Sequence, residues 1–226
     1  MARAFHYEKF FCNELTFEKN DKCLLLGPHP DDETFGCGGL LIKYPDNFDI
    51  VCLTDGRDGG YGEESKEELA VIRKNEFKSV MEKLKITSYK FLDIPDRKLI
   101  YGYDTFKSLE LEKYDYIFVP NYFDQHKDHK AVTNLVQKYF INTKSKDNVK
   151  IVFYEVWAAL AFPNYYIDIT RIMDQKKELI QEYHSQSRHV NFLEGICALN
   201  RYRGMLVNRD YAELFSIIDL NTFMKL

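Results

Sequence analysis

The sequence predicts an α/β protein, with a Rossmann-like, mostly parallel sheet, helices on both faces and a C-terminal cap segment. Over the first 155 or so residues, short apolar runs alternate with amphipathic segments, as expected for buried parallel strands joined by crossover helices. The 226-residue chain also shows no internal repeat and no linker rich in Pro, Gly or Ser. These observations predict a single domain over residues 1–226.

Five strands are predicted in the first part of the chain, each a short apolar run. The first stops at Gly27-Pro28, and polar residues follow several of the others. The predicted strands cover residues 23–26, 48–53, 89–92, 116–119 and 150–154. Because these runs are too short for helices, we expect them to form a sheet core of about residues 22–155.

Helices are predicted between these strands. A short one over residues 36–42 should end just before Pro45, because a residue that precedes proline disfavours the helical conformation. Residues 65–84 form the clearest helix, since their apolar residues recur at the helical period and Ser65 with Glu68 matches a capping box.

A further helix is predicted at residues 132–140, after the fourth strand, and the chain changes character after about residue 155. Residues 156–226 show less regular patterning, and we expect them to pack on the sheet as a C-terminal cap. The elements expected there are a strand at 165–168, a helix at 172–183 and a helical segment at 192–206.

Composition and charge exclude several classes of protein. With 31 basic and 35 acidic residues, the chain lacks the basic excess that nucleic-acid binding requires. Its five cysteines are widely spaced and contain no Cys-x-x-Cys pair, which indicates a reducing compartment. Residues 1–11 carry charges where a signal peptide needs an apolar stretch, and no apolar run is long enough to span a membrane. We therefore expect a cytoplasmic protein with no nucleic-acid partner and no integral membrane segment.

A polar cluster follows the first predicted strand. It contains His29 and the carboxylates of Asp31, Asp32 and Glu33. Neighbouring carboxylates repel one another, and a divalent cation offsets that repulsion. Taken alone, these acidic residues also suit the capping of the next helix.

A second polar cluster, with His126 and His129, follows the fourth predicted strand. His129 precedes the apolar face of the next helix closely, so its side chain can point over the strand ends. In the doubly wound order 3-2-1-4-5, the first and fourth strands are neighbours and the order reverses between them, so their loops line one crevice. We therefore expect the two clusters to form one site.

The residue types in this site suit metal-assisted amide hydrolysis. Two imidazoles and one carboxylate, with a fourth position left to water, are typical of catalytic zinc, and the expected ligands are His29, Asp32 and His129. Asp31 is then placed to take a proton from water. His126 is placed to stabilise an oxyanion or to protonate the leaving amine.

At these residues the sequence resembles the LmbE-like, or PIG-L, family of zinc-dependent N-deacetylases. The resemblance rests on His-Pro-Asp-Asp-Glu at residues 29–33 and His-x-x-His at residues 126–129, with shorter matching motifs between about residues 22 and 190. It implies a Rossmann-like fold. It also implies that an acetyl group is removed from an N-acetylglucosamine-type amino sugar, in a small molecule or a glycoconjugate precursor.

The resemblance implies a role for each residue of the site. It places zinc (Zn2+), with Fe2+ as the alternative metal, on His29, Asp32 and His129. It makes Asp31 the general base and His126 the residue that stabilises developing charge. These roles agree with those expected from the residue types alone.

Substrate contacts implied by the resemblance fall on Arg73 and Asp96. Arg73 lies within the apolar stripe of the long helix, as does Glu76, and a buried charge needs a partner. An ion pair of Arg73 with Glu76, or with a carboxylate of the 29–33 loop, is therefore the structural alternative. Asp124 is a candidate for orienting one of the histidines through a hydrogen bond, or is merely solvated.

One rival function stays open on this evidence. A non-catalytic metal- or carbohydrate-binding module on the same fold would need the same ligands, although it would need no base beside the metal. Tyr101 and Tyr103 are candidates for stacking on a sugar ring. The expected partner is a small-molecule N-acetylated amino sugar, while the aglycone, the native metal and homo-oligomer formation are left open.

Overall fold

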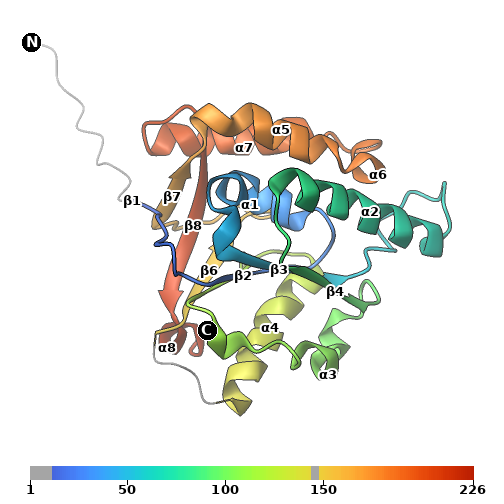
Figure 1. The fold of residues 1–226 in the computed structure, drawn as a ribbon, viewed down its shortest axis with the longest axis horizontal. Coiled ribbons are helices and arrows are strands. Elements are labelled where there is room, and N and C mark those ends of the chain that lie inside the picture. Colours follow the sequence, from blue (N-terminus) through green and yellow to red (C-terminus); the bar gives the residue numbers. More distant parts are fainter. Residues whose placement is uncertain (1–11, 144–147) are drawn as a thin grey trace, which may run out of the picture.

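The computed structural model describes residues 12–143 and 148–226. Its centre is an eight-stranded sheet with the order β1-β7-β8-β6-β5-β2-β3-β4 (Figure 1). The strands are β1 Asn13–Glu14, β2 Cys23–Gly27, β3 Phe48–Thr54, β4 Tyr89–Ile94, β5 Tyr116–Pro120, β6 Lys150–Tyr154, β7 Tyr165–Asp168 and β8 Ala212–Asp219. Neighbouring strands are parallel except around β8, which runs antiparallel to both β6 and β7.

Helices cover both faces of the sheet: α1, α2, α5, α6 and α7 lie on one face, and α3, α4 and α8 on the other (Figure 1). Their bounds are α1 Asp32–Lys43, α2 Lys66–Leu84, α3 Tyr103–Phe106, α4 Lys127–Asn142, α5 Met173–Gln181, α6 His184–Ser187, α7 Phe192–Leu206 and α8 Leu220–Phe223. Short 3-10 helices occur at Pro45–Asn47, Leu99–Tyr101, Leu111–Lys113 and Thr170–Ile172. Within the described residues, no helix combines the length and the apolar character needed to cross a membrane.

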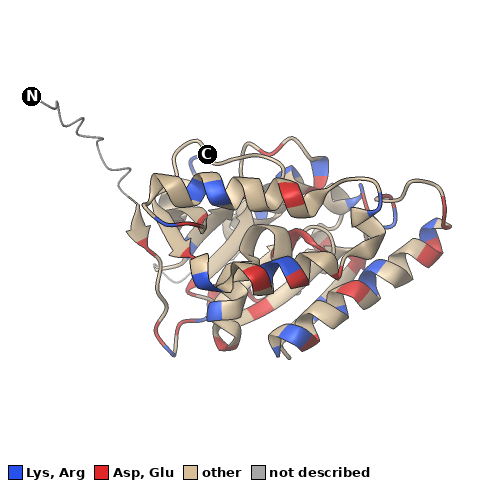
Figure 2. Ribbon diagram, turned by 90° about the horizontal axis from the view of Figure 1, so that it is seen from above, with Lys and Arg blue, Asp and Glu red and all other residues tan. Residues whose placement is uncertain are grey.

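Acidic and basic residues are interspersed along the helices in the view of Figure 2, in keeping with the formal net charge of −4. The five cysteines all lie in the described residues and are unpaired. Residues 1–11, which contain the charged residues noted above, lie outside the described residues.

The predicted fold class is confirmed. All five predicted strands are present, and the order β4-β3-β2-β5-β6 is the expected 3-2-1-4-5 order. Leu24 and Leu26 of β2 pack into the core beneath the sheet, whereas Leu25 packs into the core on the opposite face. A strand buried on both faces has no polar alternation, which explains why its sequence is an unbroken apolar run.

Helix α1 begins at Asp32, earlier than the predicted start at Gly36. The acidic residues of its first turn, Asp32 and Glu33, are favoured there by the helix dipole. Its glycines serve close packing instead of starting the helix. A Cβ atom on Gly36 would lie 2.4 Å from a ring carbon of Tyr154 on β6. The helix therefore lies directly against the sheet, with its N-terminus at the carboxyl end of β2.

The capping box predicted for α2 is present, with the Ser65 side chain accepting a hydrogen bond from the backbone of Glu68.

Residues after 155 extend the sheet as well as covering it. Strand β7 lies where a strand was expected, and α7 has the expected bounds. The helix predicted at 172–183 corresponds to α5, which ends at Gln181, and the short helix α6 follows it from His184. Strand β8 was not predicted, because its buried residues include a charged one, Glu213, which interrupts the apolar run.

A buried polar network around Glu213 fixes this segment to α1. The Glu213 carboxylate accepts hydrogen bonds from the backbone N–H groups of Gly39 at 2.6 Å and Leu40 at 2.8 Å. Lys176 Nζ donates to Glu213 Oε1 at 2.7 Å and to Asn200 Oδ1 at 2.9 Å. A buried ion pair is tolerated when its hydrogen-bonding groups are satisfied in this way. Elements α5, α7 and β8 are thus joined to the helix that carries Asp32.

Close packing of α1 on β6 predicts the effect of adding one methyl group. We expect Gly36→Ala to lower the free energy of unfolding by about 1–3 kcal/mol, because overpacking forces the neighbours apart. The new Cβ would lie 2.4 Å from the Tyr154 ring and 2.8 Å from the carbonyl oxygen of Glu155. Urea denaturation followed by circular dichroism measures this change.

Gly195 on α7 provides the matched control, because no atom of the part of the chain that the structure describes lies within 4 Å of a Cβ atom built there. Gly195→Ala should stabilise the protein by about 0.5–1 kcal/mol through helix propensity. Equal unfolding free energies for Gly36→Ala and the wild type would contradict the packing account.

Candidate active site

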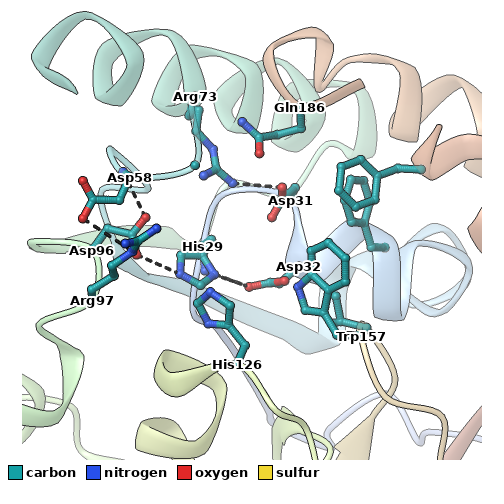
Figure 3. A pocket seen from close by; sticks show the side chains of 14 residues that line it. His29, Asp31, Asp32, Asp58, Arg73, Asp96, Arg97, His126, Trp157 and Gln186 are labelled. Atoms are coloured by element: carbon teal, nitrogen blue, oxygen red, sulfur yellow. Dashed lines mark hydrogen bonds and ion pairs between the residues drawn. The ribbon is translucent and has the colours of Figure 1, made fainter. Parts of the chain in front are cut away.

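The two predicted polar clusters meet in one pocket at the carboxyl ends of the central strands (Figure 3). His29 and Asp31 lie in the loop after β2, and Asp32 is the first residue of α1. His126 is the N-cap residue of α4, and His129 lies in the first turn of that helix. The first four of these residues line the pocket, whose volume is about 90 Å³, while His129 is completely buried next to them.

The three predicted metal ligands lie together, because both imidazoles contact the same carboxylate oxygen of Asp32. Asp32 Oδ2 lies 3.1 Å from His29 Nδ1 and 3.3 Å from His129 Nε2. Four ligands around zinc at bonds of about 2.0–2.1 Å are separated by roughly 3.3 Å in a tetrahedron. The distance of Asp32 Oδ2 from each of the two imidazole nitrogens therefore matches the separation of two zinc ligands.

The hydrogen bonds of His129 leave one ring nitrogen free to bind a metal. Its Nδ1–H donates to Asp124 Oδ2 at 3.0 Å, which places the proton on Nδ1 and leaves the lone pair on Nε2. That Nε2 atom is buried and has no hydrogen-bond partner among the described residues. Since buried polar atoms are rarely left without partners, a metal ion is the expected partner. Asp124 thus contacts a histidine, one of the two alternatives considered for it.

His29 is held from its other side by two further carboxylates. Its Nε2 atom lies 3.3 Å from Asp96 Oδ1 and 3.4 Å from Asp128 Oδ2, so Nδ1 faces Asp32. Two sets of side chains have ligand atoms close enough together to hold one metal ion, namely His29 with His126 and His129, and His29 with Asp96 and Asp128. The set with His129 is distinguished by the buried Nε2 atom of that residue, which has no hydrogen-bond partner among the described residues. We therefore favour the predicted ligands His29, Asp32 and His129, and we regard Asp96 and Asp128 as groups that orient His29.

Charge in this site is distributed unevenly among its titratable groups. Burial opposes the ionisation of Asp32, yet His129 and His29 hold its pKa well below the usual range. Burial would lower the pKa of His129, but Asp32 and Asp124 raise it to about 9. A raised histidine pKa of this kind reflects an excess of negative charge, and a metal ion would take the place of the proton.

Asp31 occupies a strained position and is held there by an ion pair. Its φ angle of 142° is rare for any residue other than glycine, and such strain costs on the order of 1–3 kcal/mol. Arg73 Nη2 lies 2.9 Å from Asp31 Oδ2. The backbone N–H of Asp31 donates to Glu33 Oε2 at 3.2 Å, and Tyr183 donates its hydroxyl to the same carboxylate. Burial, opposed by Arg73, raises the pKa of Asp31 to about 8.

Arg73 therefore pairs with a loop carboxylate, which is one of the two ion pairs considered from the sequence. Glu76 instead accepts hydrogen bonds from the backbone and hydroxyl of Ser185 at 2.8 and 2.6 Å. The Arg73 guanidinium is buried, and it also donates to the carbonyl oxygens of Pro30 and Gly56 at 2.9 Å. Arg73 and Asp96 both line the pocket, as Figure 3 shows.

His126 is arranged as a hydrogen-bond donor toward the pocket. Its Nδ1 atom accepts from the backbone N–H of Asp128 at 3.3 Å, so the neutral ring carries its proton on Nε2. Burial lowers the pKa of His126, and the neighbouring His29 and His129 lower it further. The ring centroid lies 4.7 Å from that of His29, which places a neutral imidazole beside the proposed ligands.

The aromatic residues of the pocket are not those predicted. Tyr101 is 79% exposed on a 3-10 helix, and Tyr103 contacts Lys138; neither lines the pocket. Trp157, in the loop after β6, and Phe192, at the start of α7, line it instead. The signal that sequence reasoning missed is the position of the chain's single Trp, directly after a strand whose carboxyl end borders the site.

Comparison with known proteins supports the same interpretation. The family model described as PIG-L, GlcNAc-PI de-N-acetylase, matches residues 24–140, a region that contains both histidine motifs. The chain is 29% identical over 195 residues to a diacetylchitobiose deacetylase of Thermococcus kodakarensis, covering 75% of this chain and 72% of that protein.

Solved structures share the fold. The N,N'-diacetylchitobiose deacetylase of Pyrococcus horikoshii has a TM-score of 0.78 at 24% identity, covering 88% of this chain and 84% of that one. GalB, a 4-carboxy-2-hydroxymuconate hydratase of Pseudomonas putida, has a TM-score of 0.69 at 20% identity, covering 88% and 96%. At these identities the likeness establishes the fold alone. Because the family model matches just over half of its length, the chain belongs to the PIG-L family.

Proposed function

We propose that this protein is a zinc-dependent hydrolase that removes the N-acetyl group from an N-acetylglucosamine-type amino sugar, in a small molecule or a glycoconjugate precursor. The observation that carries the proposal is the convergence of His29, Asp32 and His129 beside a pocket that presents Asp31 and His126. Membership of the PIG-L family and the diacetylchitobiose deacetylase relative support the reaction and the substrate class.

His29, Asp32 and His129 would hold the metal in this proposal. Two imidazoles and one carboxylate suit zinc, and the same set also accepts Fe2+. When bound, the divalent cation supplies Lewis acidity, which polarises the amide carbonyl and acidifies a water molecule. Asp124, Asp96 and the other carboxylates around the imidazoles keep the ligand nitrogens oriented.

Asp31 is the proposed general base. Its carboxylate would take a proton from the attacking water and later give it to the nitrogen of the leaving amine, so that the C–N bond breaks and acetate and a free amine result. Burial raises the pKa of Asp31 to about 8. A divalent cation nearby would lower this pKa, so that the carboxylate is ionised and able to accept a proton. Arg73 acts in this scheme by holding Asp31 in its strained position.

His126 is the proposed donor to the oxyanion that forms on the amide carbonyl. Its neutral ring carries a proton on Nε2, and such a preorganised donor stabilises negative charge that develops in the transition state. Arg73 and Asp96 remain proposed substrate contacts because both line the pocket. Their hydrogen bonds to Asp31 and His29 indicate an additional role in positioning those residues.

Two features bear on the cell context and on the rival function. The five unpaired cysteines support the proposed cytoplasmic location. A metal- or carbohydrate-binding module would bind the same ligands without turnover, so a chemical assay separates the two functions.

The proposed reaction is tested by acetate release from N-acetylglucosamine, its methyl glycoside and N,N'-diacetylchitobiose. We expect acetate and free amine in equal amounts, loss of activity after chelation, and recovery with Zn2+ or Fe2+, because the metal supplies the Lewis acid. An enzymatic acetate assay and an amine-reactive dye measure the two products. Binding of these sugars by metal-loaded protein with no acetate release would support the binding module instead.

Replacement of the proposed base should separate chemistry from metal binding. We expect Asp31→Asn to lower kcat by about 10²–10⁴-fold, because proton transfer to a positioned base contributes on this order. Asparagine tolerates a positive φ angle, so the strained backbone should persist. Metal content by mass spectrometry should remain at the wild-type level, because Asp31 is not one of the proposed ligands.

The exposed Asp104→Asn provides a control for the loss of one carboxylate, and it should keep full activity. His126→Gln in the same assay should lower kcat by about 10²–10³-fold with metal retained, as loss of an oxyanion donor does. Full activity of metal-loaded Asp31→Asn would remove Asp31 from the role of base, and full activity of His126→Gln would remove His126 from its role.

A further inference from the structure

We propose that a second pocket, next to the candidate active site, binds an apolar aglycone carried by the amino-sugar substrate. This inference rests on the proposed deacetylase function and specifies its substrate. The sequence indicated no residues for aglycone recognition, whereas the structure places an apolar cavity directly beside the proposed reaction centre.

The second pocket adjoins the first. It has a volume of about 270 Å³, against about 90 Å³ for the pocket at the proposed ligands. The two share the wall formed by Phe35, Val156, Trp157 and Phe192. The Phe35 and Phe192 rings stack at 5.0 Å, and Trp157 meets Phe192 edge-on at 5.4 Å. A molecule bound at the reaction centre can therefore extend along this aromatic wall.

The rest of the lining is supplied mainly by α7 and the residues just before it. Aliphatic side chains come from Val190, Ile196 and Leu199, and Gly195 exposes its backbone. Trp157 is 58% exposed. Clusters of exposed apolar side chains usually mark a binding surface. Apolar lining and concave shape together favour an apolar ligand.

Polar groups of this pocket are already engaged with the protein. The Glu155 carboxylate accepts from Arg203 Nε at 3.1 Å and from the backbone N–H of Leu160 at 2.6 Å. Asn191 caps α7, accepting from the backbone of Glu194 at 3.1 Å and donating to its carboxylate at 2.9 Å. The pocket therefore favours neither a charged nor a strongly hydrogen-bonding ligand.

The two pockets suit different parts of one glycoside. Asp58, Asp96 and Arg97 line the first pocket and offer partners for sugar hydroxyl groups. The only apolar part of an acetyl group is one methyl group, which is too small to fill the second pocket. In a 2-acetamido sugar, the carbon that carries the aglycone is bonded to the carbon that carries the amide. An amide at the proposed metal ligands therefore brings the aglycone close to the shared aromatic wall.

The test compares the methyl and hexyl β-glycosides of N-acetylglucosamine as substrates for acetate release. We expect kcat/KM to be at least about 10-fold higher for the hexyl glycoside, because each methylene bound in an apolar pocket adds substantially to transition-state binding. Gly195→Phe should remove this preference and leave the methyl glycoside unaffected, since its ring would grow into the open space above Gly195. Gly195→Ala is the matched control and should keep the preference.

Trp157 gives a second readout that does not depend on turnover. It is the only tryptophan of the chain and lies on the shared wall, so its fluorescence should respond to an apolar group in the second pocket. Titrations use the Asp31→Asn protein, in which the glycoside should be consumed at least about 100-fold more slowly. The hexyl glycoside should shift the emission at lower concentration than the methyl glycoside, and Gly195→Phe should abolish that difference.

The outcomes separate this inference from the proposed function. Acetate release at equal kcat/KM from both glycosides, with equal titrations, would overturn the aglycone pocket and leave the deacetylase standing. Tighter binding of the hexyl glycoside without any acetate release would support the pocket and refute the deacetylase. Preference for methyl N-hexanoylglucosaminide over the hexyl glycoside of N-acetylglucosamine would assign the pocket to an acyl chain and overturn the aglycone proposal.

Discussion

The site depends on a concentration of buried carboxylates around two imidazoles. Asp32 lies between His29 and His129, and each imidazole contacts a further carboxylate on its other side, Asp124 or Asp96. Buried like charges are costly unless cations or hydrogen bonds balance them. Arg73 balances Asp31, but the carboxylates around the histidines outnumber their basic partners. A divalent cation at Asp32 would restore the balance and bind the buried His129 Nε2 atom, which has no hydrogen-bond partner within residues 12–143 and 148–226.

The fold delivers these groups to one place through close packing. Gly36 lets α1 lie against β6, so that Asp32 begins the helix at the carboxyl end of β2. The network around Glu213 then joins the C-terminal segment to the same helix. This segment supplies Phe192 to the pocket wall and most of the apolar cavity beside it. One helix thus links the proposed chemistry to the part of the chain proposed to recognise the substrate.

The sequence was informative where a local pattern determines the structure. The strand order and the meeting of His29 with His129 follow from buried strands and the change of order between β2 and β5. Strand β8 and the network at Glu213 were not predictable in this way, because a buried charge is stable only through partners distant in the sequence. The pocket's aromatic residues were missed for a similar reason. Trp157 and Phe192 come together only when α7 packs against the loop after β6.

Metal binding by the purified protein tests the central claim most directly. Metal-free wild type, Asp32→Asn and His129→Ala would be titrated with Zn2+ against a chromogenic chelator, with Asp104→Asn as the control. The account predicts one tight site in the wild type and the control. Loss of a hydrogen-bond partner of a metal ligand typically lowers metal affinity by about 10–100-fold. The account predicts a larger loss of Zn2+ affinity for Asp32→Asn and His129→Ala, because each removes a ligand itself. Wild-type affinity in Asp32→Asn and His129→Ala would contradict the account, because the carboxylate cluster would then have another purpose.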